Sequence, residues 1–393
     1  LFIGLTVSAE EIIRDRKILK RESFLNLSRF SYLFSKIAIM FFLSAIQTIS
    51  FILIGNWILG IKGMTIDYWL ILFTTSCFAN MLGLNISSAF NSAVTIYILI
   101  PFLLIPQLLL SGVIVKFDKL NPIIAAENTV PIAGEIMASR WAFEALAVNQ
   151  FKRNKYERQF YKYDKIMSNA GFKKDFWIPK IREKINACEN NYNNPENRQQ
   201  FESDLLLLRN ELSIEKEVNI EVEMNFLDKL TPEQFNNAEV FAYAKTYVDK
   251  LQKHYIRQYN KASDDRDNLI SKYNKTPEDK EKFIALKNNY ENDNLSDLVK
   301  NKNEFNKILE KNNELIQRAD PVFLDPVKST GVRSHFFAPR KKVFGKYIDT
   351  FWVNIMVIWS MSLGLAITLY FDLLKKLLDS LEKLALRFSK KAS

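Results

Sequence analysis

The side chains that most often carry out enzymatic chemistry are sparse in this sequence and poorly placed for it. The two histidines, His254 and His335, lie far apart, with no cysteine or clustered carboxylate at a metal-ligand spacing. Cys77 falls in an apolar run and Cys188 stands alone in a polar tract, so neither a disulfide nor a zinc site is expected. The sequence contains no Ser-His-Asp arrangement and no glycine-rich phosphate loop. We therefore expect no catalytic centre and no metal site in this chain.

Long apolar runs are the most informative feature of the sequence. Ile37–Ile61 is followed by Tyr68–Val115, which contains no Asp, Glu, Lys or Arg over 48 residues. A helix needs roughly 20 apolar residues to cross a bilayer, so the second run is long enough to cross twice. Together with Thr350–Phe371, these runs predict an all-α membrane protein with spans at 37–61, 68–86, 93–115 and 350–371. Pro101 and Pro106 predict kinks in the third span.

The distribution of charge predicts the orientation of these spans. A cationic segment lies within residues 1–36, before the first span, and another within residues 372–393, after the last. Because cationic flanks stay in the cytoplasm, both are expected inside, and four crossings then place residues 151–346 outside. Leucines recur at helical spacing through 372–393, so this basic tail is expected to lie along the inner membrane surface or on a cytoplasmic partner. The net charge of +10 does not indicate a nucleic-acid partner, because basic residues flank the spans or mix with acidic ones.

The segments between the third and fourth spans differ in character. Residues 116–150 are broken by proline and charge, so we expect short helices at the outer interface. There Arg140 and Glu144 lie four residues apart, which predicts a pair on one helix face near the outer surface. Residues 151–346 are long enough to form a separate domain. Three helix-start signals predict that this domain is mainly helical, namely Asn194-Pro195-Glu196, Thr231-Pro232-Glu233 and Thr276-Pro277-Glu278. The alternating stretch Val218–Met224 predicts one strand.

Several polar and aromatic side chains fall within the predicted spans. Gln47, Asn80 and Asn85 would either hydrogen-bond between helices or line a substrate path, and the sequence leaves both open. The phenylalanines of the spans would likewise either pack and meet lipid or face a hydrophobic substrate; they are Phe41, Phe42, Phe73, Phe78, Phe90 and Phe102.

Three motifs occur in the same order as in a known family of membrane domains. The charged run Asp15–Glu22 precedes the Tyr-containing step Ser31–Lys36, Ser111–Val115 follows as a Ser-Gly span end, and Arg140–Phe151 carries an Arg-aromatic-x-Phe-x-Ala-Leu pattern. Together they resemble the membrane domain of G-subfamily ABC transporters, the white and pleiotropic-drug-resistance type with an ABC-2 fold. Trp141 and Gln150 depart from the Tyr and Glu of the family pattern. The resemblance covers Leu1–Phe151 and Thr350–Phe371.

The resemblance implies a role for each segment of the chain. Leu1–Val7 would end a second span, and the spans listed above would be the third to sixth. A nucleotide-binding domain that holds ATP and Mg would precede them in a longer protein. The segment Ser8–Arg29 would connect to that domain, and six charged residues are candidates for the coupling ion pairs: Glu11, Arg14, Asp15, Arg16, Arg21 and Glu22. A solvated positive flank is the alternative for this segment. The family's outer loop is far shorter than residues 151–346.

Two functions follow from these observations. The first is an ATP-driven exporter of a hydrophobic or amphipathic substrate, working as a homodimer or with a related half-transporter. The second is an ATP-driven machine that transmits motion to an outer partner, such as an envelope protein bound by residues 151–346, without transporting anything. A static anchor would need only one span. Frequent Asn, Lys and Ile favour a bacterial inner membrane, with residues 151–346 in the periplasm.

Overall fold

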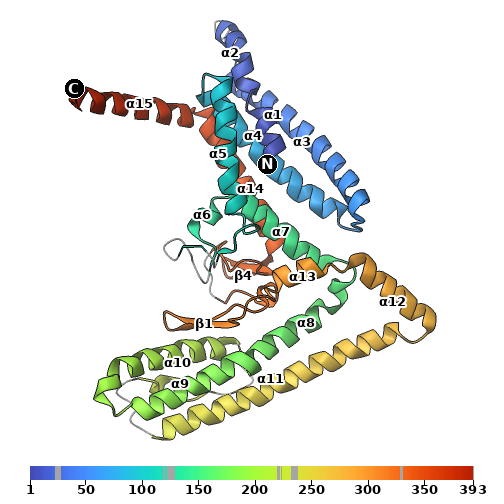
Figure 1. The fold of residues 1–393 in the computed structure, drawn as a ribbon, viewed down its shortest axis with the longest axis vertical. Coiled ribbons are helices and arrows are strands. Elements are labelled where there is room, and N and C mark those ends of the chain that lie inside the picture. Colours follow the sequence, from blue (N-terminus) through green and yellow to red (C-terminus); the bar gives the residue numbers. More distant parts are fainter. Residues whose placement is uncertain are drawn as a thin grey trace. The chain divides into compact units, whose positions relative to one another are not determined.

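The structure is a computed structural model in which two compact parts of the chain can be described. The described residues are 1–22, 28–117, 120–121, 129–218, 222, 224–231, 238–327 and 331–392, except for the side chains of Lys20, Glu22, Ala238 and residues 385–392. One part, called here the membrane unit, consists of Leu1–Gln150 and Ile348–Ser393. The other, called here the insertion unit, is Phe151–Tyr347. Figure 1 shows the elements of both.

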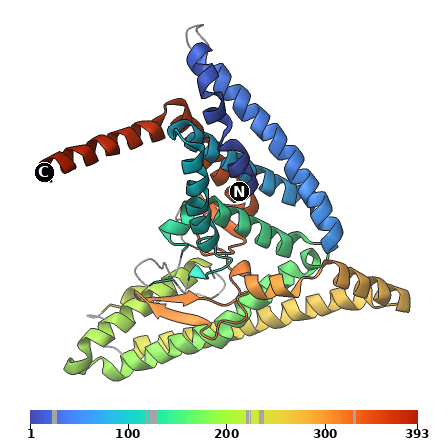
Figure 2. The same ribbon diagram turned by 45° about the horizontal axis from the view of Figure 1, so that its top comes forward.

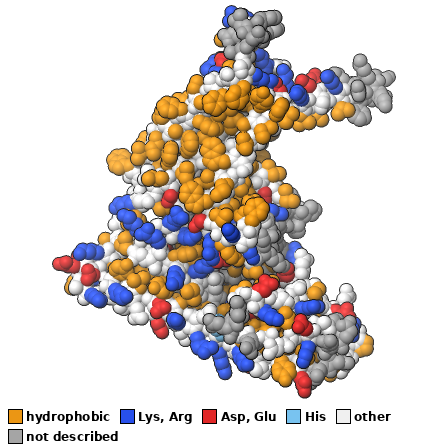
Figure 3. Space-filling model, turned by 180° about the vertical axis from the view of Figure 1, so that it is seen from behind, with side chains coloured by type: hydrophobic (Ala, Val, Ile, Leu, Met, Phe, Trp, Pro, Cys, Tyr) orange, Lys and Arg blue, Asp and Glu red, His pale blue; other side chains and the backbone are white. Residues whose placement is uncertain are grey.

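Long apolar helices make up the membrane unit. Among the described residues, α3 (Arg29–Leu59), α4 (Thr65–Ala89) and α14 (Thr350–Tyr370) are long and apolar enough to cross a membrane. Gly60 ends α3 in a left-handed conformation (φ 68°), which glycine adopts without steric cost. Hydrophobic side chains gather over the outside of this unit, as Figure 3 shows. The exposed side chains of α3 include Phe42, Phe51 and Trp57. These helices confirm the predicted fold class, a mainly helical membrane protein.

Helix α4 is the centre of the membrane unit and packs against α1 (Phe2–Ser8), α3 and α14. Two glycines allow α1 to approach it closely. A Cβ added to Gly83 would lie 2.0 Å from Ser8 Oγ, and a Cβ added to Gly4 would lie 2.9 Å from the Ser76 carbonyl oxygen. Small residues at such a crossing let two backbones pack directly, as is common between membrane helices.

The third apolar helix is shorter than the sequence predicts. Helix α5 (Ala93–Leu109) contains Pro101 and Pro106 and ends six residues before the predicted Val115. The chain turns away at Ser111-Gly112, where Gly112 has φ 81°, so the helix is about 26 Å long. Ser8 ends α1, with its hydroxyl donating to the Gly4 carbonyl (2.7 Å), and α2 (Glu11–Glu22) begins three residues later.

The segment after α5 packs on the spanning helices. Its described helices are α6 (Ile132–Glu135) and α7 (Ala138–Arg153). Trp141 and Ala145 of α7 join a hydrophobic cluster with Phe78 of α4 and with Phe351 and Ile358 of α14. The chain ends with α15 (Leu373–Ala392), which turns away from α14 in both Figure 1 and Figure 2.

The insertion unit is built from helices with two short hairpins. Helices α8 (Glu157–Phe172) and α11 (Ala238–Tyr273) run side by side (Figures 1 and 2). The other helices are a π-helical segment η3 (Lys173–Trp177), α9 (Ile178–Asn191), η4 (Pro195–Asn197), α10 (Arg198–Val218), η5 (Leu227–Lys229), α12 (Pro277–Tyr290), α13 (Asp293–Val299) and η6 (Pro321–Phe323). Leucine, isoleucine and aromatic side chains of α9, α10 and α11 form its main core, among them Ile185, Leu208 and Leu251.

The predicted helix starts at Asn194 and Thr276 are present, and each side chain caps the backbone that follows. The third signal, at Thr231, runs into residues 232–237, and the predicted strand at Val218–Met224 includes 219–221 and 223; these positions lie outside the described residues.

Two antiparallel hairpins were not predicted. They are β1 (Ile308–Lys311) with β2 (Glu314–Gln317), and β3 (Arg340–Val343) with β4 (Lys346–Asp349). Each turn contains two successive residues with positive φ: Asn312 and Asn313 in the first, Phe344 and Gly345 in the second. This backbone matches the twist of the strands that it joins.

Candidate coupling site and buried polar clusters

The charged helix α2 is clamped to the start of α3 by a single lysine. Glu11 and Asp15 lie one turn apart on α2, so both carboxylates face the same way. The Lys36 ammonium of α3 lies 2.8 Å from Glu11 Oε2 and 2.7 Å from Asp15 Oδ2. All three side chains are largely buried, which reduces screening of the pairs by water and salt. Arg14 adds a bond to Glu11 (2.7 Å), but its own side chain is mostly exposed.

The same helix also holds the end of α4. Ser87 Oγ accepts hydrogen bonds from the backbone N–H groups of Ile12 and Ile13, each at 3.0 Å. Arg16 Nη2 donates to the carbonyls of Ser88 and Phe90, each at 3.1 Å. A cation is favoured at the carbonyl end of a helix, where the helix dipole is negative. Helix α2 is therefore bonded to α3 at one place and to the end of α4 at another.

Four of the six predicted coupling residues take part in these contacts: Glu11, Arg14, Asp15 and Arg16. The Arg21 side chain is exposed, and the Glu22 side chain lies outside the described set. Lys36, which binds two of these residues, is not among the predicted coupling residues. The spacing of Glu11 and Asp15 was the available signal for a shared cation, but the partner lies 25 positions away from Glu11 and cannot be identified from spacing alone.

The buried side chains of Asn80 and Asn85 form hydrogen bonds between helices. Asn80 Nδ2 donates to the Met40 carbonyl (3.1 Å) and to Ser44 Oγ (2.8 Å), which binds α4 to α3. Asn85 Nδ2 donates to the Leu365 carbonyl (2.8 Å), and its Oδ1 accepts from Thr368 Oγ1 (2.8 Å), which binds α4 to α14. These are the interhelical hydrogen bonds that polar side chains form in membranes.

Gln47 is different, because its side chain is exposed on α3. The role of these three residues in a substrate path stays a prediction.

A buried ion cluster surrounds Arg140 in α7. The Arg140 side chain is fully buried, and its Nη1 lies 3.3 Å from Glu144 Oε2 and 3.6 Å from Glu135 Oε2. The Trp141 ring lies under the guanidinium, 4.0 Å from its central carbon. Asn354 of α14 donates to Glu144 Oε2 (2.8 Å) and to the Trp141 carbonyl (2.9 Å), which attaches the cluster to a spanning helix. The predicted pair is therefore within ion-pair distance, but it lies in the interior of the unit.

The insertion unit contains a second group of buried charges, on α8. Burial raises the pKa of Glu157 to about 7, because the charged carboxylate loses water there. Asp164 and Glu291 raise it further, whereas Lys300 and Arg266 lower it. Arg266 also pairs with Asp164 at 2.7 Å, so α8 and α11 are joined by charge as well as by packing.

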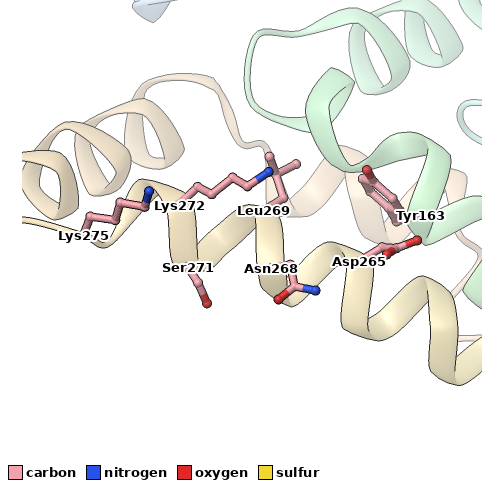
Figure 4. A pocket seen from close by; sticks show the side chains of 7 residues that line it. All are labelled: Tyr163, Asp265, Asn268, Leu269, Ser271, Lys272 and Lys275. Atoms are coloured by element: carbon pink, nitrogen blue, oxygen red, sulfur yellow. The ribbon is translucent and has the colours of Figure 1, made fainter.

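An open depression of about 530 Å³ lies between α8 and α11 (Figure 4). Its lining is polar and of mixed charge and consists of Tyr163, Asp265, Asn268, Leu269, Ser271, Lys272 and Lys275. Ligand sites are usually enclosed and mostly apolar, and this one is neither. We assign it no role.

Spanning helices joined by buried asparagines, with a charged helix clamped to their ends, define a multi-pass helical membrane protein. Residues 1–151 match the family model of ABC-2 type transporters, and this stretch is an ABC-2 type transporter membrane domain. Domains of this type pair with a nucleotide-binding partner and indicate a role in transport across a membrane. The match covers less than half of the chain and ends where the insertion unit begins. No curated protein and no solved structure matches the chain.

Proposed function

We propose that this chain is the membrane-spanning part of an ATP-driven ABC exporter of the G-subfamily type, with a hydrophobic or amphipathic substrate. ATP and Mg would bind to a nucleotide-binding domain in a preceding part of the protein, and two half-transporters would work together. The observation that carries the proposal is the double attachment of α2. Because Lys36 binds α2 to α3 and Arg16 binds it to the end of α4, a push on α2 displaces both helices together.

The decisive experiment removes the clamp and leaves the nucleotide-binding domain unchanged. In the full-length protein, Lys36→Met keeps an unbranched apolar chain and removes the ammonium that binds Glu11 and Asp15. We expect ATP hydrolysis to continue while its stimulation by substrate and the transport itself are lost. Lys17→Met is the matched control, because Lys17 is an exposed lysine of α2. If Lys36→Met transports as well as Lys17→Met, the coupling role is wrong.

The proposal includes an orientation in which α2 and α15 are cytoplasmic and the insertion unit is extracytoplasmic, in the periplasm if the membrane is a bacterial inner membrane. Two exposed serines allow a paired test: Ser271 on α11 and Ser380 on α15. A membrane-impermeant maleimide applied to intact cells, with any outer membrane opened, should label Ser271→Cys before lysis and Ser380→Cys only after lysis. The reverse pattern would invert the orientation.

The size of the insertion unit favours a second candidate function. Phe151–Tyr347 has a hydrophobic core of its own, so it can act as a separate body that receives motion and passes it to an envelope protein. Replacing Phe151–Tyr347 by a short flexible linker separates the two functions. An exporter should keep substrate-stimulated ATP hydrolysis without this unit. A protein that transmits motion to an envelope partner should lose its cellular phenotype without this unit. Its ATP hydrolysis should not be stimulated by substrate, with or without the unit.

A further inference from the structure

Helix α15 carries a clean apolar face that the membrane unit leaves uncovered. Leu373, Leu377, Leu381 and Leu384 recur three or four residues apart and are each about half exposed, between 45% and 55%. At 100° per residue, Leu374 and Leu378 fall on the same side of the helix. The charged residues Lys376, Asp379 and Lys383 fall on the opposite side. An apolar face of this width is stabilised when lipid or another protein surface removes it from water.

The charge of α15 indicates what lies against this apolar face. Residues 373–392 contain six Lys and Arg against two Asp and Glu, so this segment carries a net charge of +4. A leucine-rich face opposite a basic face is the pattern of helices that lie in the lipid headgroup layer, with their apolar side a few ångströms into the acyl chains. Anionic lipids at such a surface attract each nearby lysine or arginine.

The start of α15 is fixed where a membrane surface is expected. Helix α14 ends in the adjacent exposed rings of Tyr370 and Phe371, and aromatic residues gather at the interface between lipid and water. Asp372 then takes a left-handed conformation (φ 49°) that ends α14 and allows a new direction for α15. Arg29, the first residue of α3, pairs with Asp372 (2.6 Å) and donates to the Leu369 carbonyl (3.3 Å), so it holds this turn.

We propose that α15 is a surface-bound helix that lies in the headgroup layer at which α14 ends and binds its anionic lipids through its lysines. Helix α15 begins directly after the turn that ends α14, so the membrane surface is the nearest cover for its apolar face. A second copy or a soluble partner would have to compete with that surface. The inference requires that α14 crosses the membrane, and it does not depend on transport. It therefore stands or falls separately from the exporter proposal.

The test uses the full-length protein in lipid nanodiscs with single labelled cysteines. An environment-sensitive fluorophore is attached at Leu381→Cys on the apolar face and at Asp379→Cys on the polar face. The unsubstituted protein is the background control, because both native thiols are buried. We expect brominated lipid chains to quench the label at 381 and aqueous iodide to quench the label at 379. Quenching of both labels by iodide would mean a helix free in water and would overturn the proposal. Protection of the label at 381 from both quenchers would mean a protein partner and would also overturn it.

The lipid specificity has its own test. Lys375→Gln, Lys376→Gln and Lys383→Gln together remove three of the six positive charges of α15 and leave its leucines in place. In the unaltered helix, adding phosphatidylglycerol to phosphatidylcholine nanodiscs should increase quenching of the label at 381 by brominated chains. The triple variant should show a smaller increase. An equal response to phosphatidylglycerol in both proteins would refute the assignment of anionic lipid.

Discussion

Replacing Arg140 by methionine should strongly destabilise the membrane unit. Arg140 is fully buried between Glu144 and Glu135, and Met fills much of the space without the charge. Removing one partner of a buried ion pair leaves the other charge without compensation, which costs about 3–5 kcal/mol. That cost includes the contact with the Trp141 ring, because the same guanidinium makes both. For a unit of this size the loss corresponds to a fall of roughly 6–20 °C in Tm.

The buried thiol of Cys77 provides the assay. Cys77 lies in α4 and is fully buried, so in a Cys188→Ala background a fluorogenic maleimide reports the unfolding of the membrane unit alone. Arg21→Met is the matched control, because Arg21 is an exposed arginine of the same unit; it should change stability by less than about 0.5 kcal/mol. Adding Glu144→Gln to Arg140→Met should recover part of the loss, since it removes one of the two carboxylates. A Tm for Arg140→Met equal to that of Arg21→Met would refute the argument.

Four further predictions follow from single contacts. Because the pKa of Glu157 is raised from 4.5 to about 7 in the folded protein, its contribution to stability is complete below about pH 4.5 and is lost as the pH rises to about 7, by roughly 3 kcal/mol at most. Glu157→Gln should reduce the fall in stability with rising pH in urea unfolding curves and be more stable than the parent at pH 8. Equal pH dependence in the two proteins would contradict this. Burial raises the pKa of the Cys188 thiol to about 12, so the folded protein should resist maleimide at this position until the insertion unit unfolds, and rapid labelling of the native protein would contradict its burial. Asp372→Asn keeps a residue that tolerates positive φ and removes only a half-exposed ion pair, so it should cost less than about 1 kcal/mol in the Cys77 assay, whereas Asp372→Val should cost clearly more; equal losses would show that the turn itself is unimportant. Asn80→Ala should cost about 0.6–2 kcal/mol in the same assay, because it breaks two hydrogen bonds between α3 and α4, and an unchanged Tm would mean that these bonds contribute nothing.

The sequence predicted those features that depend on neighbouring residues. Apolar run length identified α3, α4 and α14, and the four-residue spacing of Arg140 and Glu144 identified their contact. The end of α5 was predicted too late, because an uncharged sequence does not reveal that Ser111-Gly112 turns the chain away before the apolar run is over.

Contacts between residues far apart in the sequence could not be predicted from spacing and composition. The clamp on α2 needs Lys36, and the cluster at Arg140 needs Asn354, which lies more than 200 positions further along the chain. Asn354 was visible as a polar residue within an apolar run, but nothing in the sequence indicated its partner. The Asn312-Asn313 pair was a usable signal for the first hairpin, since both residues adopt positive φ readily, whereas Phe344 in the second turn gave no such signal.

The position of α14 in the chain has a consequence for biosynthesis. Asn85 on α4 and Glu144 on α7 both form hydrogen bonds with α14, yet 196 residues are translated between the end of α7 and the start of α14. At a translation rate of 5–20 residues per second, that interval lasts roughly 10–40 s. During this time the nascent protein holds polar groups at membrane depth without their final partners. A factor that shelters unfinished membrane helices would have its opportunity to act in this interval, before α14 completes the bundle.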